Sequence, residues 1–488
     1  MINDGYGGYD VIPGTYGSVY IDKSQETELN FSVDIEAVDA DAATVANTHG
    51  TIYDSRAQFK ATIKNNSTGE YNKYVLAPLF ICQWDAEKDK YTGSMVTYKQ
   101  QQLSLAAGEE KTLYFDFDNL AYGSVYSMNI YARNNVPDSE EASHVDNIVT
   151  PGESKYYAIE RGIITWTGDG TRQGYKPADG FAIPDDAAAV SLEGLSIAIV
   201  GANSNPNTLY FLGTGQEAPA GLEGKNIISG NQAGNIALED GYDFFTPQTF
   251  TAQNISYTRT FTEGHNNSVS TGWSTIVLPF APATVANKTD GETIDWFRSA
   301  DDSGKQFWLC DFAEEDGTDV YFRNAPEMLA NVPYIVAVPD NKWGAKWDLR
   351  GKEIEWSATN STIKPGAIAY TIGQNMFFAG TYAKSTLEEI LALNTDGSHF
   401  TAGANPTVEA FHAYFDYINA PATAAEQVSI KIIGGETDGI RLTEVSASKN
   451  EENAVYDLQG RRLKTENSNL STLPKGVYIV GGKKIVKR

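Results

Sequence analysis

The sequence has little cysteine, little histidine and no long apolar run. Its 488 residues include only 2 Cys and 5 His, too few for a disulfide-stabilised scaffold or a cysteine-rich zinc site. No stretch of about 18 apolar residues occurs, so we expect no transmembrane helix. The N-terminus has no basic segment followed by an apolar one, and it therefore does not predict a signal peptide.

Positive charge is also scarce. Lys and Arg number 37 against 63 Asp and Glu, which gives a formal net charge of −26. This balance argues against nucleic acid or an anionic membrane surface as the main partner, because phosphate groups attract the opposite charge. The 41% hydrophobic and 11% aromatic content is enough for folded cores. At typical domain sizes the length predicts about three or four domains.

Alternation of apolar and polar residues over 23–137 indicates half-buried β-strands. Residues 59–63 are one such strand, and Tyr126 ends a Leu-x-x-Gly-x-x-Tyr sequence. That sequence is typical of a tyrosine corner, in which the Tyr hydroxyl bonds back to the backbone at a crossover between sheets. We predict an immunoglobulin-like β-sandwich here, preceded by a leader or edge strand over 1–22.

The rest of the chain also reads as β structure, so the fold class we predict is all-β. A linker is expected at 138–155. Short apolar pieces between Asn-rich turns favour a small solenoid-like segment over 156–250. Six of the eight Trp and several Asp-Gly turns predict a larger β-sandwich over 251–435. Within it, only residues 385–393 have a helical pattern, with capping-box spacing at their start.

The last part of the chain, 436–488, carries three motifs in order: Tyr-Asp-x-x-Gly-Arg, Leu-Pro-x-Gly-Val-Tyr and a basic final strand. The residues of the first two motifs are Tyr456, Asp457, Gly460, Arg461, Leu473, Pro474, Gly476 and Tyr478. Together they resemble a C-terminal sorting domain of the type IX (Por) secretion system. This resemblance implies recognition by the secretion machinery, export across the outer membrane and display at the cell surface or release. Such export also needs a signal peptide, so we expect Met1 to be a fragment start.

Residues 185–435 carry a second set of motifs. The segments 272–280, 394–400 and 411–415 occur in this order and resemble C-terminal modules of exported surface proteins, some of which have leucine-rich repeats upstream. The resemblance implies the same cellular location and assigns no activity.

Signatures of catalysis and metal binding are weak. The sequence has no Gly-x-Ser-x-Gly elbow, no His-Glu-x-x-His and no phosphate-binding glycine loop. We interpret Cys82 and Cys310, which lie in apolar stretches, as core thiols; a disulfide between them is the minor alternative. Asp316 and Asp319 offer oxygen ligands that make calcium the only cofactor to consider. A solvated turn is the favoured interpretation, so no metal site and no catalytic residue is assigned.

Two tryptophans are the main candidates for binding. Trp343 and Trp347 lie among charged neighbours, and exposed indoles beside polar groups form platforms for sugar rings or protein partners. The alternative is that they close the core of the larger sandwich.

The leading hypothesis is a non-enzymatic, exported cell-surface protein that serves in adhesion or binds glycan or host protein. One alternative is the C-terminal accessory region of a secreted protease or glycoside hydrolase. Another is a structural spacer.

Overall fold

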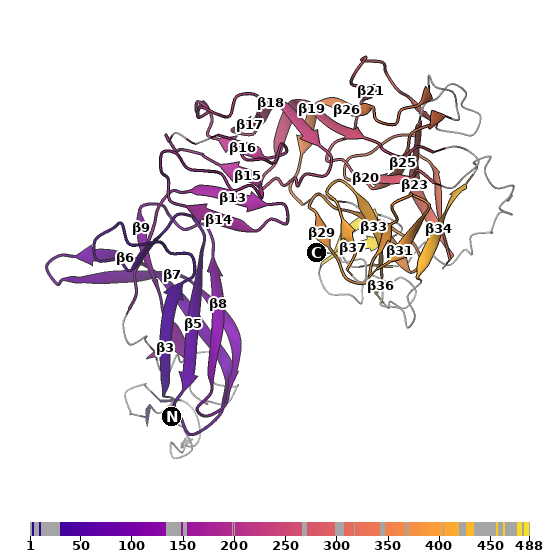
Figure 1. Cartoon of the computed structure of the whole chain (residues 1–488). Coiled ribbons are helices and arrows are strands. Elements are labelled where there is room, and N and C mark those ends of the chain that lie inside the picture. Colours follow the sequence, from indigo (N-terminus) through magenta and orange to yellow (C-terminus); the bar gives the residue numbers. More distant parts are fainter. Residues whose placement is uncertain are drawn as a thin grey trace. The chain divides into compact units, whose positions relative to one another are not determined.

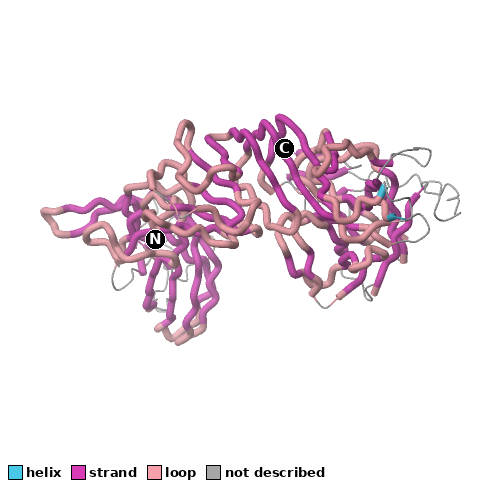
Figure 2. The backbone as a smooth tube through the Cα atoms, turned by 45° about the horizontal axis from the view of Figure 1, so that its top comes forward, coloured by secondary structure: helices cyan, strands magenta, loops and turns pink. Residues whose placement is uncertain are grey.

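A computed structural model describes most of the chain. Full description covers residues 30–132, 154–197, 199, 201–265, 271–297, 307–316, 318–341, 347–366, 368, 370–403, 405–418 and 426–433, with the backbone of short strands elsewhere. These residues are all-β: besides strands and turns they contain single 3₁₀ positions at Asn341 and Trp347, and no α-helix (Figure 2). No helix within them could span a bilayer. They form two compact units, one mainly of residues up to 164 and one mainly from 182 onward.

The first unit is a β-sandwich (Figure 1). One sheet has the order β3-β5-β8, and the other has the order β11-β10-β6-β9-β12-β4, with β7 paired to β6. The strands are β3 (Phe31–Ala37), β4 (Gly50–Ile52), β5 (Ala57–Asn65), β6 (Tyr71–Asp85), β7 (Lys90–Leu105), β8 (Glu110–Phe117), β9 (Ser124–Met128), β10 (Ile130–Ala132), β11 (Ile148–Val149) and β12 (Tyr157–Ile159). A separate pair joins β1 (Ile2–Asn3) and β2 (Tyr9–Asp10).

Alternating side chains fill the core between these sheets. The predicted strand 59–63 buries every second residue, and Phe59 and Ile63 are fully enclosed. Phe59 meets Phe117 edge to face, with ring centroids 6.0 Å apart, an arrangement that aromatic pairs prefer. The Tyr126 hydroxyl accepts a hydrogen bond from the Ala121 N–H at 3.1 Å. The tyrosine corner is therefore confirmed.

The β6–β7 hairpin is unusually long, with strands of 15 and 16 residues. Its strands pair in antiparallel register from Tyr71 with Leu105 to Asp85 with Lys90, interrupted by a register shift between Leu79 and Phe80. The other edge of β6 pairs with β9 and β10. The outer part of the hairpin carries the aromatic side chains of the site described below.

The second unit begins with short strands that pair in parallel. The strands β15 (Ala187–Ser191), β16 (Leu209–Leu212) and β17 (Asn226–Ser229) follow one another in this way, and β18 (Gln232–Glu239) pairs in parallel with β19 (Phe250–Thr260). Parallel pairing of successive short strands is typical of a solenoid. β19 crosses the expected boundary at residue 250 and pairs with β26 (Glu353–Ile363), which pairs with β21 (Thr284–Asn287). The stack and the following region therefore share one sheet. Ahead of β15 the chain forms β13 (Ile163–Thr167) and β14 (Arg172–Tyr175).

A further sheet in this unit has the order β20-β25-β23-β24-β34-β31-β30-β33-β28-β27, with β22 paired to β23. Its strands are β20 (Ser274–Ile276), β22 (Trp296–Phe297), β23 (Phe307–Glu315), β24 (Asp319–Asn324), β25 (Tyr334–Ala337), β27 (Tyr370–Ile372), β28 (Met376–Gly380), β30 (Leu391–Leu393), β31 (His399–Ala402), β33 (Ala413–Tyr417) and β34 (Gln427–Ile433). Trp356 of β26 is 1% exposed and packs against Tyr257.

The prediction of a helix at 385–393 is wrong. Ser385 and Thr386 form β29 (Ser385–Thr386) and pair with β32 (Thr407–Val408). Glu389 has a positive φ of 58°, in the left-handed region that a right-handed helix cannot include. Pairing with a strand distant in sequence thus overrides the local capping signal.

The C-terminal strands form a small antiparallel sheet of order β36-β35-β37-β38. Their bounds are β35 (Val455–Tyr456), β36 (Arg462–Leu463), β37 (Gly476–Val480) and β38 (Lys483–Lys487). β37 and β38 pair along their whole length, with Tyr478 opposite Ile485. The part of the second motif from Gly476 to Tyr478 and the basic final strand are thus neighbours in this sheet.

Candidate functional site

A pocket of about 680 Å³ lies against the β6–β7 hairpin of the first unit. Its walls come from both hairpin strands, from a loop that precedes β4 and from the start of β9. The lining residues are Val45, Ala46, Asn47, Ile81, Cys82, Gln83, Trp84, Tyr91, Thr92, Gly93, Ser94, Gly123, Ser124 and Val125. The volume falls within the range of roughly 300–1,000 Å³ that is usual for small-molecule sites.

Aromatic rings form one wall of this pocket. Trp84 and Tyr91 are directly paired across the hairpin. Their ring centroids are 5.1 Å apart, and the ring planes are inclined at 73° to each other. Tyr156 packs against Tyr91 with ring centroids 4.3 Å apart. The Tyr91 hydroxyl donates a hydrogen bond to the Ala46 carbonyl at 3.2 Å. These contacts hold the wall in place without a ligand, so little side-chain entropy remains to be lost on binding.

None of the lining residues carries a charge, although the chain as a whole is strongly acidic. The loop before β4 contributes the Asn47 amide. The side chains of Gln83, Thr92 and Ser94 alternate to the hairpin face opposite Trp84 and Tyr91, so the lining strands offer the aromatic face their backbone donors and acceptors. Burial raises the pKa of the Cys82 thiol to about 11. Since the thiolate is the reactive form, Cys82 is a neutral lining group at physiological pH. The pocket therefore offers an aromatic face with uncharged donors and acceptors.

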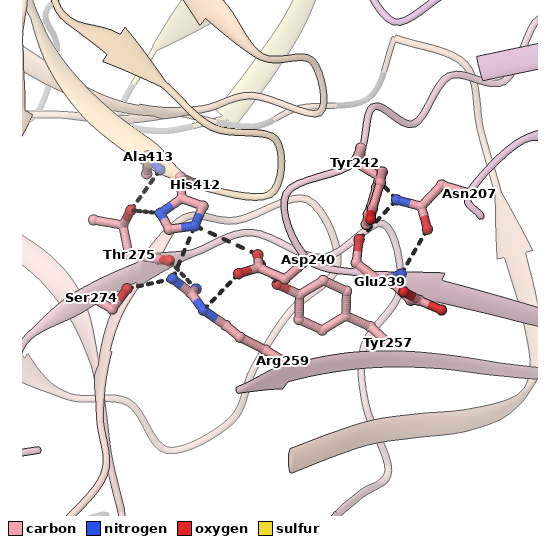
Figure 3. A network of polar contacts seen from close by, with 10 residues as sticks. All are labelled: Asn207, Glu239, Asp240, Tyr242, Tyr257, Arg259, Ser274, Thr275, His412 and Ala413. Carbon is pink, nitrogen blue, oxygen red and sulfur yellow. Dashed lines mark hydrogen bonds and ion pairs between the residues drawn. The ribbon is translucent and has the colours of Figure 1, made fainter. Parts of the chain in front are cut away.

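The second unit contains a buried polar network around Arg259 (Figure 3). Arg259 is 7% exposed, and its Nε lies 3.1 Å from the Asp240 carboxylate. Its Nη1 and Nη2 donate to the Thr275 carbonyl at 2.7 Å and to the Ser274 hydroxyl at 2.5 Å. Nη2 also lies 2.9 Å from His412 Nε2. Arg259 thus connects β19, the turn after β18, β20 and the residue before β33.

The hydrogen bonds determine the proton position on His412. A guanidinium can only donate, so His412 Nε2 accepts from Arg259 and must be unprotonated. His412 Nδ1 then carries the proton and donates to the Thr275 hydroxyl oxygen at 3.3 Å. Nε2 also lies 3.5 Å from Asp240 Oδ1, a contact that becomes attractive only if His412 is protonated. The arrangement is therefore built around a neutral imidazole.

The pKa values follow from the same contacts. Burial and the neighbouring Arg259 charge lower the pKa of His412. Burial alone would raise the pKa of Asp240, but Arg259, His412 and a hydrogen bond from the Tyr257 hydroxyl bring it well below its usual value. Every group of the network is matched by partners within the protein. We therefore assign the network to structural stabilisation.

We expect the free energy of unfolding to fall as the pH is lowered from about 7.5 to 5. The unfolded chain protonates its His residues near the ordinary pKa of about 6.5, whereas folded His412 resists protonation, so acid favours the unfolded state. His265 acts in the same direction because burial also lowers its pKa. Below about pH 4 the lowered pKa of Asp240 adds a further loss. Urea unfolding at several pH values measures this slope, which should become shallower in His412→Gln. An unchanged slope in that variant would contradict the assignment.

Of the two tryptophans proposed from sequence for binding, Trp347 does not line this pocket. Trp347 is half-buried in the second unit, and Trp343 lies outside the described residues. Asp316 accepts hydrogen bonds from the Asp319 N–H at 3.0 Å and from the Tyr321 hydroxyl at 2.8 Å, so its carboxylate serves a turn. Within the described part of the chain, no three His, Cys, Asp or Glu side chains are grouped to hold a metal ion.

The cysteines are free, and Cys310 is fully buried as expected for a core thiol. Cys82 is only partly buried because it borders the pocket. Of the sorting motif, Tyr456 lies in β35, and Gly476 and Tyr478 lie in β37. The remaining motif residues, Asp457, Gly460, Arg461, Leu473 and Pro474, lie outside the described residues.

The pocket was missed from sequence, although a signal was present. Trp84 and Tyr91 flank the charged stretch from Asp85 to Lys90, which suits the exposed end of a hairpin. Placing that turn would have set the two aromatic residues opposite each other on neighbouring strands. The network around Arg259 has no comparable signal, because its members come from distant parts of the sequence.

Comparison with known proteins adds little. No family model and no curated protein matches the chain. Among solved structures, a CARDB domain from Pyrococcus furiosus, crystallised with di-metal ions, is 16% identical over 27% of this chain and 94% of its own, with a TM-score of 0.16. A β-glucosidase from Listeria innocua is 11% identical over 27% of this chain and 16% of its own, with a TM-score of 0.17. At these TM-scores neither likeness supports an inference about function.

Proposed function

We propose that this chain is a non-catalytic part of an exported cell-surface protein, which binds a glycan or a host protein through its first unit. The observation that carries the proposal is the uncharged aromatic pocket at the β6–β7 hairpin, whose wall is already ordered by Tyr156 and Ala46. Binding proteins benefit from such order because rigid aromatic side chains bury a large area at low entropic cost.

Location at the cell surface rests on the C-terminal motifs. They resemble a sorting domain of the type IX secretion system, and their strands pair as a small antiparallel sheet. In this proposal the C-terminal sheet is recognised by the secretion machinery, while the first unit supplies the binding site. The larger sheets of the second unit lie between the first unit and the C-terminal sheet in the sequence.

Removing residues 440–488 should abolish surface display. We expect the truncated protein, expressed with a signal peptide in a host with this secretion system, to accumulate in the periplasm. Antibody labelling of intact cells and fractionation measure the distribution. The replacement Lys464→Ala within the same region but outside the two motifs serves as a control and should be displayed normally. Surface labelling of the truncation at the level of the full chain would refute the sorting assignment.

The binding role is tested by flow cytometry of host epithelial cells incubated with the labelled full chain. We expect saturable binding that unlabelled chain competes away. Absence of saturable binding to cells and to extracellular glycoproteins would contradict the proposed function.

A further inference from the structure

We infer that the pocket at the β6–β7 hairpin binds a neutral hexopyranose residue of a glycan, with the sugar ring packed against Trp84 and Tyr91. This inference rests on the proposed binding function and names its site and ligand class.

The shape of the aromatic wall supports a ring-shaped ligand. The axial C–H groups of a hexopyranose form an apolar face, and an indole is the preferred surface for such a face because it is large and electron-rich. Trp84 is half-buried, and Tyr91 meets it nearly at right angles. One ring can therefore serve as the platform while the other closes one side.

The polar groups around the wall suit sugar hydroxyls. Amides and hydroxyls both donate and accept, as hydroxyl groups require. Asn47 lies in the loop before β4, outside the hairpin, whereas the side chains of Gln83, Thr92 and Ser94 alternate to the hairpin face opposite Trp84 and Tyr91. A bound ring would thus find the Asn47 amide and backbone groups of the lining strands as its hydrogen-bonding partners.

The absence of charge in the lining sets the ligand class. A sialic acid or a sulfated sugar carries an anionic group that needs a cationic or closely matched partner when it is desolvated. The lining residues provide none, and the net charge of −26 adds a long-range repulsion. A neutral sugar carries no such penalty. The lining also contains no carboxylate that could pair with a Lys or Arg side chain. A basic peptide from a host protein is therefore a less suitable ligand than a neutral sugar.

Binding of the full chain to a glycan array tests the inference. We expect saturable binding to neutral glycans such as lactose and N-acetyllactosamine, with at least tenfold weaker binding to their sialylated counterparts. Trp84→Ala should weaken neutral-glycan binding by at least tenfold, and Trp84→Phe, which retains a ring, by less. Tyr98→Ala is the matched control: Tyr98 lies on β7, the other strand of the same hairpin, is 56% exposed and does not line the pocket, so binding should be unchanged.

Thermal unfolding of each variant separates loss of binding from loss of folding. If Trp84→Ala does not fold, two other results test the inference. Trp84→Phe should bind neutral glycans more weakly than the unmodified chain, and free lactose should compete for binding. Unchanged glycan binding in a folded Trp84 variant, or preference for sialylated glycans, overturns the inference. An array without binding, alongside saturable binding to host cells, also overturns it but leaves the proposed function intact. Failure of both assays contradicts the proposed function as well.

Discussion

Replacing Arg259 with Met should destabilise the second unit by about 3–5 kcal/mol, the usual cost of removing one partner from a buried ion pair. The Asp240 carboxylate would lose the guanidinium that lies 3.1 Å away. The Ser274 hydroxyl, the Thr275 carbonyl and His412 Nε2 would lose their donor at the same time. Methionine fills a similar volume, so the loss reports mainly the polar contacts. Urea unfolding of the full chain, followed by tryptophan fluorescence, measures the effect.

Arg323 provides the matched control for this variant. It forms a similar paired contact with Asp311, at 2.8 Å, but its side chain is 62% exposed. Water solvates the Arg323 guanidinium there, and pairs with an exposed partner contribute at most about 1 kcal/mol. We therefore expect Arg323→Met to change the free energy of unfolding only slightly. Similar effects of the two substitutions would show that the network around Arg259 does not stabilise the unit as described.

Replacing Asn207 with Ala should cost about 3 kcal/mol. Asn207 is fully buried, and its side-chain amide donates to the carbonyls of Glu239 and Tyr242 at 2.8 and 2.7 Å. Its Oδ1 accepts from the Glu239 N–H at 2.6 Å (Figure 3). Alanine leaves these backbone groups without their partner, and each buried unpaired group costs roughly 1–3 kcal/mol. Chemical unfolding of the variant measures the loss.

The same substitution should also disturb Asp240, because Asn207 fixes the turn that carries it. The pH dependence of stability in Asn207→Ala is therefore expected to be shallower than in the unmodified chain. Asn254→Ala is the control, since Asn254 is an exposed Asn that bonds Asn235 on the neighbouring strand, and it should change stability by less than about 0.5 kcal/mol. A loss of that small size for Asn207→Ala would contradict the structural role given to its amide.

The general fold was predictable because its signals are local. Alternation in the strand 59–63 follows from the two-residue repeat of a β-strand, and the tyrosine corner at Tyr126 follows from a short motif. Both are confirmed. The helix at 385–393 shows the limit of such signals. A capping-box spacing favours a helix only weakly, and the pairing of Ser385 with Val408 outweighs it.

The candidate sites were harder to predict because they depend on distant contacts. The pocket needs the register of the β6–β7 hairpin, the loop that contains Asn47 and the start of β9 at Ser124. The polar network joins Arg259 to His412, which is 153 positions away. A single sequence shows that such residues are present but does not show that they meet. The prediction of binding at Trp343 and Trp347 rested on their charged neighbours. That feature is local, and it does not specify a binding surface.

The most direct test of the central claim is a binding assay that also detects catalysis. Purified full chain is applied to immobilised mucin and glycans, and bound protein is scored together with released sugars and peptides in the same wells. The proposed function predicts saturable binding without released products. Release of sugars or peptides by the purified chain would contradict its non-catalytic role, and the absence of binding on every surface would contradict its role in adhesion.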